Sequence, residues 1–148
     1  MEAVLMKRIT GVIAALTAVL LAAGCAFGPG TQDWTYYGLP GDYSLWRSSA
    51  RSITIGVGTE KDAAQVVVDK YVSEIFFNDS CILAKQVEVP EDLNEKITFN
   101  APVYFIITVA DNGVMGPLGE NAFKNKCGEL GITDINWTDT KNYAGMAE

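Results

Sequence analysis

An apolar run near the N-terminus, Ile9–Ala23, constrains this chain most, because it separates a segment expected to be removed from the part of the chain that can fold into a domain. Two positive charges, Lys7 and Arg8, precede the run. Its fifteen residues are fewer than the ~20 that a helix needs to cross a bilayer core. A charged start, a short apolar stretch and small residues after it are typical of a secretory signal peptide. We expect residues 1–24 to be such a signal, with Met6 the better candidate for the true start.

A cysteine, Cys25, stands directly after Ala22, Ala23 and Gly24. This order resembles the lipobox of bacterial lipoproteins, although Ala22 occupies a position where Leu is commonest. The resemblance implies that Cys25 is the lipidation site, with diacylglycerol on its sulfur and cleavage before it. Two acyl chains hold a protein on a membrane, so residues 25–32 would form a lipidated tether. The alternative is an ordinary signal peptide followed by a cysteine by chance.

Cleavage before Cys25 leaves 124 residues, which suits one domain with its own core. We expect a single α+β domain at residues 33–143 and a frayed tail at residues 144–148. The mature part has 9 Lys and Arg against 17 Asp and Glu, a net charge of −8. Such a surface repels phosphate backbones, so nucleic acid is not expected as a partner. The charge would suit a basic partner, and it also keeps a small exported domain soluble.

Two cysteines follow Cys25, namely Cys81 and Cys127, and the chain has no histidine. Outside the cytoplasm two cysteines can form a disulfide. Two buried thiols are the alternative, because free cysteine packs well as a small hydrophobe. The lack of histidine removes the commonest general base and the commonest zinc ligand. We therefore predict no cofactor, no metal and no catalytic residue.

Apolar and alternating stretches predict most of the secondary structure. The predicted strands are Tyr43–Trp46, Ser52–Ile55, Val66–Phe77, Cys81–Val89 and Val103–Val109. The turn at Asn78–Ser80 would join the third and fourth of these into a hairpin. The polar segment Glu88–Pro102, which prolines bound, is expected to be an exposed loop.

One helix is predicted, at Pro117–Gly131, followed by a short extended segment at Ile132–Trp137. Phe123, Cys127 and Leu130 recur as a narrow apolar stripe, and Gly131 suits the left-handed residue after a helix. The expected fold class is α+β, an antiparallel β-sheet of about five strands with one C-terminal helix packed on it.

Five aromatic residues lie within thirteen positions at the start of the predicted domain. They are Trp34, Tyr36, Tyr37, Tyr43 and Trp46. Rings that stay exposed would form a binding face for a sugar or a protein, with Trp34, Tyr37 and Trp46 as the candidates. The alternative is that the rings belong to the core and fix the N-terminal segment to the sheet.

Two groups of polar residues are candidates for sites of chemistry. Glu91, Asp92 and Glu95 are close in sequence, but they lie in a segment expected to be solvated, where carboxylates are poor acid–base catalysts. Oxygen-bearing residues alternate from Asp134 to Asp139, without the glycine that a calcium loop of the EF-hand type needs. Roles in turns and helix caps are predicted for this second group.

Several short segments follow one another in a characteristic order, namely Asp33-Trp34, Leu39–Tyr43, Leu45–Arg47, Tyr71–Glu74, Asn78-Asp79, Gly116-Pro117, Cys127–Ile132 and Trp137. This order resembles one family of short lipoproteins of Gram-positive bacteria, known as domain of unknown function 3997. The chain departs from the pattern at Gly41-Asp42, where Asn-Gly is usual, and in a longer Glu88–Pro102 loop. The resemblance implies a location and a fold, and it carries no catalytic or binding residues.

These observations favour a membrane-anchored, extracytoplasmic lipoprotein whose domain binds a protein or a glycan at the cell envelope without catalysis. The alternative is an acidic inhibitor or immunity-type protein that acts on a basic envelope hydrolase or toxin, which the charge of −8 favours. An enzyme without histidine is a third class, and it would require a pocket in which carboxylates converge.

Overall fold

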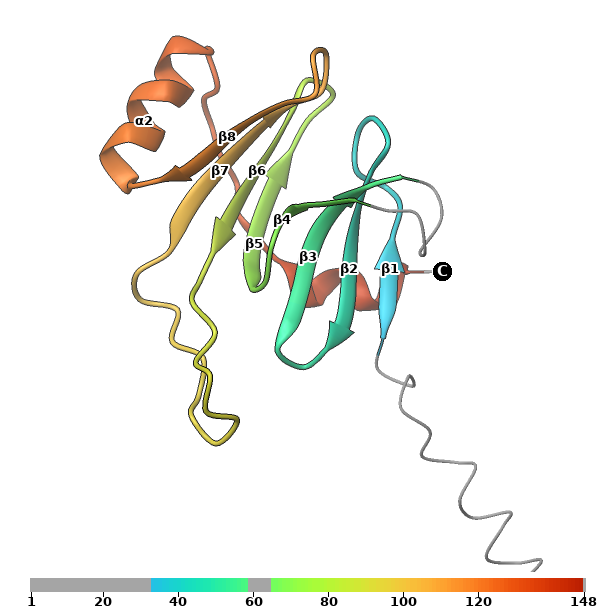
Figure 1. Cartoon of the computed structure of the whole chain (residues 1–148). Coiled ribbons are helices and arrows are strands. Elements are labelled where there is room, and N and C mark those ends of the chain that lie inside the picture. Colours follow the sequence, from blue (N-terminus) through green and yellow to red (C-terminus); the bar gives the residue numbers. More distant parts are fainter. Residues whose placement is uncertain (1–32, 59–64, 148) are drawn as a thin grey trace, which may run out of the picture. The chain divides into compact units, whose positions relative to one another are not determined.

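The structure is a computed structural model that describes residues 33–58 and 65–147. These residues belong to one compact unit (Figure 1). The predicted signal peptide, the lipidation site Cys25 and the tether at residues 25–32 lie outside the described residues. None of the helices described in residues 33–147 has the length and apolar character needed to cross a bilayer.

Within the described residues, nine strands form two antiparallel sheets. The first sheet, sheet A, has the order β1-β2-β3-β4, with β1 (Trp34–Tyr36), β2 (Tyr43–Ser49), β3 (Ser52–Val57) and β4 (Gln65–Val68). The second, sheet B, has the order β8-β7-β6-β5-β9. Its strands are β5 (Val72–Phe77), β6 (Cys81–Gln86), β7 (Val103–Thr108), β8 (Gly113–Leu118) and β9 (Thr138–Asp139).

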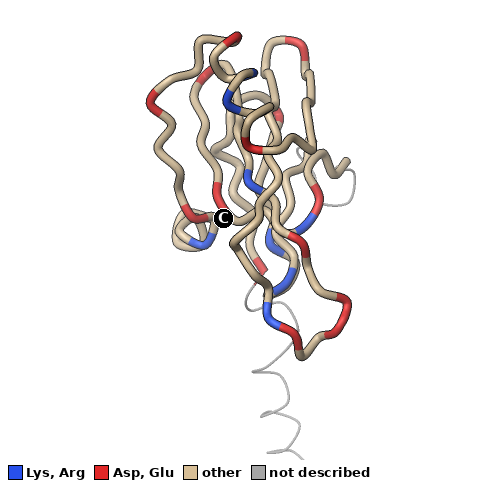
Figure 2. The backbone as a smooth tube through the Cα atoms, turned by 90° about the vertical axis from the view of Figure 1, so that its left-hand side faces the viewer, with Lys and Arg blue, Asp and Glu red and all other residues tan. Residues whose placement is uncertain are grey.

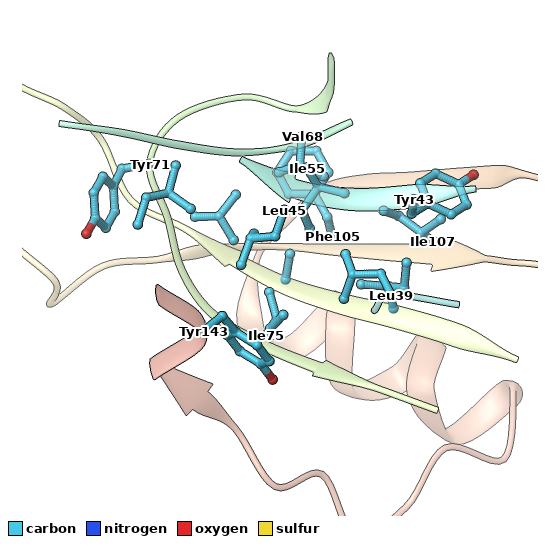
Figure 3. Packing of buried hydrophobic residues seen from close by; sticks show 14 of the residues in the cluster. Leu39, Tyr43, Leu45, Ile55, Val68, Tyr71, Ile75, Phe105, Ile107 and Tyr143 are labelled. Carbon is cyan, nitrogen blue, oxygen red and sulfur yellow. The ribbon is translucent and has the colours of Figure 1, made fainter. Parts of the chain in front are cut away.

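Sheet A packs on one face of sheet B and forms the main core with it. Alternate residues of a strand point to opposite faces, so Leu45 and Ile55 of sheet A meet Ile75 and Ile107 of sheet B in one buried cluster. Figure 3 shows this packing, with Tyr143 of the 3-10 helix η1 (Thr140–Met146) at its edge. Both sheets therefore depend on one continuous apolar interior.

The other face of sheet B is covered by helix α2 (Glu120–Glu129). Phe123 and Cys127 of the helix are buried against Cys81, Leu83 and Ile106 of the sheet. Gly131 follows the helix with φ of 68°, the left-handed conformation expected there. The predicted contact between the helix and a five-stranded sheet is confirmed, and β7 is buried on both faces because sheet A and α2 lie on opposite sides of it.

The expectation of a single sheet is wrong, because Val66–Phe77 is not one strand. The segment divides into β4, which joins sheet A, and β5, which joins sheet B. Asp69 and Lys70 interrupt it: the Asp69 carboxylate accepts a hydrogen bond from the Lys70 amide at 2.7 Å, and the Gln86 side chain donates to the Asp69 carbonyl at 2.9 Å. Two consecutive polar residues with local partners favour a turn over a ladder.

The helix is shorter than Pro117–Gly131. Pro117 and Leu118 belong to β8, a strand that the sequence did not predict, and Leu118 pairs with Tyr104 of β7. Leu130 is 43% exposed, so it does not continue the apolar stripe. Ala144–Met146, the first residues of the expected tail, lie in η1.

Candidate functional site

The face of sheet B that carries α2 changes from apolar to charged along its strands. Near the helix, Leu83 pairs with Ile106 and both are buried. Two residues further along β6, Lys85 pairs with Glu74 of β5, and Glu74 pairs in turn with Asp139 of β9. Residues directly opposite in antiparallel strands have their Cβ atoms about 5 Å apart. The ladder therefore gathers two carboxylates and an ammonium at the end of the sheet that α2 leaves uncovered.

A pocket of about 240 Å³ opens at this charged end. Strands β5, β6 and β9 form its floor, the Glu88–Pro102 loop forms one wall, and the start of η1 forms another. Its lining residues are Tyr71, Ser73, Glu74, Lys85, Phe99, Pro102, Asp139 and Lys141. We call this the sheet-end pocket.

Lys85 is held rigidly at the floor of the sheet-end pocket. Its ammonium donates to Glu74 Oε2 at 2.5 Å and lies 4.4 Å from the centroid of the Trp137 ring. The Lys85 side chain is only 18% exposed and that of Glu74 is 37% exposed. Ser73 Oγ donates to the Lys85 carbonyl at 3.2 Å. These contacts hold the side chains of the floor in one arrangement, so the floor does not need to rearrange when a ligand binds.

The charged groups at the rim of the pocket have fewer interaction partners than Lys85 at its floor. Asp139 accepts from the Lys141 amide at 2.8 Å through Oδ1 and so begins η1, which leaves the second oxygen of its carboxylate for other donors. Lys141 Nζ lies 5.6 Å from the centroid of the Phe99 ring, and the Phe99 side chain is 48% exposed. The rim thus combines a half-exposed ring, an ammonium and a carboxylate.

Tyr71 brings a hydroxyl to the pocket. Burial, together with the negative charge of Asp139, raises the pKa of the Tyr71 phenol, and Arg47 opposes this. A phenol is already protonated at neutral pH with its ordinary pKa of about 10, and the upward shift preserves this, so the hydroxyl can donate as well as accept. Figure 3 shows the hydroxyl of Tyr71 directed away from the other labelled core side chains.

The aromatic residues proposed as a binding face do not form a common surface. Trp34 is paired with Arg47 and packs against the main core, on the inner face of sheet A. Trp46 points to the outer face, where its ring lies over Gly56. A Cβ atom added at Gly56 would lie 2.6 Å from Trp46 Cη2. Tyr37 is 48% exposed, in the segment after β1.

Both cysteines are buried free thiols in the cluster between sheet B and α2. Burial raises the pKa of each thiol, and for Cys127 the nearby Cys81 adds to the effect. The structure thus shows two buried free thiols, which is the alternative to a disulfide. The negative charges on neighbouring thiolates would oppose each other, which favours the protonated forms.

The two polar groups that the sequence singles out lie in exposed and helix-capping positions. Glu91, Asp92 and Glu95 are exposed in the Glu88–Pro102 loop, as predicted. Asp134 lies in the irregular segment after α2 with φ of 55°, so the predicted turn is not found there, whereas Asp139 caps η1, as predicted. In the part of the chain that the structure describes, no group of three or more His, Cys, Asp or Glu side chains is arranged to hold a metal ion.

Sequence reasoning did not identify the sheet-end pocket. Its residues come from four separate segments, and only the strand register places Glu74, Lys85 and Asp139 in a row. One signal was present: Tyr71–Glu74 is among the segments that carry the family resemblance, and it supplies three lining residues, Tyr71, Ser73 and Glu74.

The fold and the pocket define a small α+β domain made of two antiparallel sheets and one packed helix, with a pocket of mixed charge at the end of the larger sheet. The family model described as "Protein of unknown function (DUF3997)" matches residues 40–141. The chain therefore belongs to this family. Neither a curated protein nor a solved structure matches it.

Proposed function

We propose that this protein is a lipid-anchored envelope protein whose sheet-end pocket binds a neutral, hydroxyl-rich ligand such as one sugar unit of an envelope glycan. One observation carries the proposal: the pocket joins a half-exposed aromatic ring to polar groups whose charges balance. The anchor at Cys25 would hold this pocket outside the cytoplasm, where such glycans occur.

The charge of the pocket favours a neutral ligand. Lys85 and Lys141 contribute two positive charges, and Glu74 and Asp139 contribute two negative ones. Lys85 is already paired with Glu74 at 2.5 Å. A phosphate would meet the carboxylates and a free cation would meet the ammonium groups, so each would find a like charge inside the pocket. Hydroxyl groups can donate to the carboxylates and accept from the ammonium and the Tyr71 hydroxyl.

The size and the ring add to this argument. A volume of about 240 Å³ lies below the range of about 300–1,000 Å³ that is typical of drug-sized ligands, and it suits a single small ring. Phe99 offers an apolar face at the rim. An aromatic face covers the C–H side of a sugar ring, while the rest of the rim contacts its hydroxyls.

Binding fits the pocket better than catalysis, although two carboxylates do converge in it. A catalytic acid needs a carboxyl group kept protonated by an apolar environment. Glu74 instead faces an ammonium at 2.5 Å, and Asp139 is exposed and caps a helix. Neither residue is placed as a proton donor, which favours a non-catalytic role.

Titration of the purified domain, residues 33–148, with a neutral oligosaccharide tests the pocket. We expect chitotriose to change the fluorescence of Trp137, whose ring contacts Lys85, while inorganic phosphate and a diamine of equal concentration have no effect. Phe99→Ala should weaken binding about fivefold, since one ring contact contributes about 1 kcal/mol. Val114→Ala, at an exposed apolar residue outside the pocket, is the matched control. Equal binding by both variants, or a response to phosphate alone, would contradict the proposal.

The anchor requires a separate test on the full chain. Metabolic labelling with a fatty-acid analogue should mark the protein, and Cys25→Ala should abolish the label and release the protein from the membrane fraction. An unlabelled chain recovered in the cytosol would contradict the anchored location.

A second candidate function is an inhibitor or immunity-type protein that acts on a basic hydrolase or toxin of the envelope. The predicted mature chain carries a net charge of −8, and Figure 2 shows acidic positions along the Glu88–Pro102 loop. Binding to a purified cationic lysozyme-type hydrolase should then weaken as salt rises, because screening reduces the attraction. Binding that is absent, or indifferent to salt, would count against this candidate.

A further inference from the structure

The loop between β6 and β7 projects beyond the strands of sheet B (Figures 1 and 2). We propose that its tip, Pro90–Lys96, is a protein-docking element that inserts Leu93 into an apolar pocket rimmed by Lys or Arg side chains on a basic partner. This inference rests on the second candidate function and names the surface that would perform it.

Leu93 is exposed far beyond the other large apolar side chains. It is 80% exposed, against 62% for Met146 and 48% for Phe99. A single exposed apolar residue is common on protein surfaces and needs no explanation by itself. What distinguishes Leu93 is that the backbone on both sides of it is fixed.

Arg51, from the turn between β2 and β3, fixes that backbone. Its guanidinium donates to four main-chain carbonyls of the loop, from Nη1 to Glu95 at 2.7 Å and Leu93 at 3.5 Å, and from Nη2 to Pro90 at 2.8 Å and Asp92 at 3.3 Å. A planar fork of donors suits this task, because several carbonyls can be bound in one fixed geometry. One side chain, from the turn that joins β2 and β3, thus holds the backbone of the tip in place.

The loop adds its own bonds to this framework. The Asp92 carboxylate accepts from the Asn94 amide at 2.8 Å, and the Asp92 carbonyl accepts from the Glu95 amide at 3.1 Å. Leu93 therefore stands at the apex of a closed turn. A residue held in one conformation before binding loses less conformational entropy when it docks, which is the basis of pre-organised recognition.

The charges around Leu93 specify the partner. Glu91, Asp92 and Glu95 flank it in the sequence and are exposed, and they outnumber the two positive charges at the tip, Lys96 and the Arg51 guanidinium bound to the loop carbonyls. The ion pairs found among the described residues join Lys85 to Glu74, Lys124 to Glu120 and Lys126 to Glu129. The three carboxylates of the tip are in none of these pairs, so they are available to cations on a partner.

Site-specific photocrosslinking in the full chain, expressed in its own host, tests this proposal. A photoreactive p-benzoylphenylalanine replaces Leu93, and in a second protein it replaces Met146, the matched exposed apolar position on η1. We expect the residue at position 93 to give a defined adduct with a protein of basic isoelectric point, in at least fivefold higher yield than at position 146, an effect of roughly 1 kcal/mol.

Two further variants relate the adduct to the proposed chemistry. Arg51→Gln should lower the yield at position 93 because it frees the loop, and Glu91→Gln with Glu95→Gln should lower it because it removes rim charge. Circular dichroism and the denaturation midpoint of each variant establish that it is folded. An adduct that is equally strong at positions 93 and 146, or unaffected by all these changes, overturns the proposal.

The outcomes also separate this inference from the function on which it rests. A basic protein crosslinked at position 146 but not at position 93 would retain the inhibitor function and reject the loop as its surface. The absence of any adduct with a basic protein at either position would reject both. An adduct at position 93 with an acidic protein or with lipid would reject the proposed partner.

Discussion

At the scale of single residues, polar side chains in this protein mostly organise turns. Asp111 closes the turn between β7 and β8: its Oδ1 accepts from Thr108 Oγ1 and, at 3.0 Å, from the Gly113 amide. These hydrogen bonds, the one from Thr108 first, lower the pKa of the Asp111 carboxyl group. The Asp-Asn-Gly sequence predicts the turn, and the lowered pKa of Asp111 links the stability of this turn to pH.

The lowered pKa of Asp111 predicts a sign for that dependence. A carboxyl group whose pKa is lower in the folded state stabilises the fold above its unfolded pKa, near pH 4, and this contribution is lost as the pH falls through the folded value. Asp111→Asn retains an acceptor but does not titrate. We expect the difference in denaturation midpoint between wild type and Asp111→Asn to be constant above about pH 5. Below about pH 4 the midpoint of the wild type should fall relative to that of the variant. Parallel midpoints down to pH 2.5 would contradict this.

At the scale of elements, helix α2 depends on a few contacts with sheet B. The Phe123 ring stacks on Tyr104, with 4.5 Å between ring centroids and an interplanar angle of 21°, and it lies 5.9 Å from Trp137. Cys127, one turn further along the helix, is buried in the same cluster. Leu130, which the periodicity placed on the same stripe, is exposed because the helix ends at Glu129.

A pair of alanine variants tests this account of the helix. Phe123→Ala should lower the free energy of unfolding by about 3–5 kcal/mol, the usual cost of removing a buried aromatic ring. Leu130→Ala should change it by less than about 1 kcal/mol, because the side chain is already 43% exposed. Chemical denaturation of both variants gives the comparison. Similar losses in the two would mean that the stripe extends to Leu130, contrary to the structure.

At the scale of the whole described domain, two sheets share one interior. Leu45 and Ile55 of sheet A and Ile75 and Ile107 of sheet B belong to a single buried cluster. Tyr143 of η1 packs on Tyr36 of β1 and on Phe77 of β5, with ring centroids 4.7 and 6.4 Å apart. Neither sheet covers its apolar face without the other, so the two should unfold together.

Tryptophans on the two sheets allow this to be measured. Trp46 lies in β2 of sheet A, and Trp137 packs on the helix side of sheet B. Single-tryptophan variants that retain one or the other should report coincident unfolding transitions, as expected for a two-state domain. Ile75→Ala, in sheet B, should then lower both midpoints equally. A Trp46 transition that is unaffected by this change would show two independent units.

The sequence by itself predicted the features that depend on neighbours along the chain. The hairpin of β5 and β6, the exposed Glu88–Pro102 loop and the left-handed glycine after α2 all follow from local chemistry. Helix propensity, turn residues and β alternation act over a few residues, and the amino-acid order records them directly.

Only the tertiary structure decided which strands share a sheet and which side chains meet. Val66–Phe77 has the composition of one buried strand, yet two polar residues divide it between sheets, because sheet A and sheet B each cover the apolar face of the other. The sheet-end pocket and the Arg51 clamp on the loop tip likewise join residues distant in sequence. Such contacts depend on register and packing across the whole core, and no local pattern encodes them.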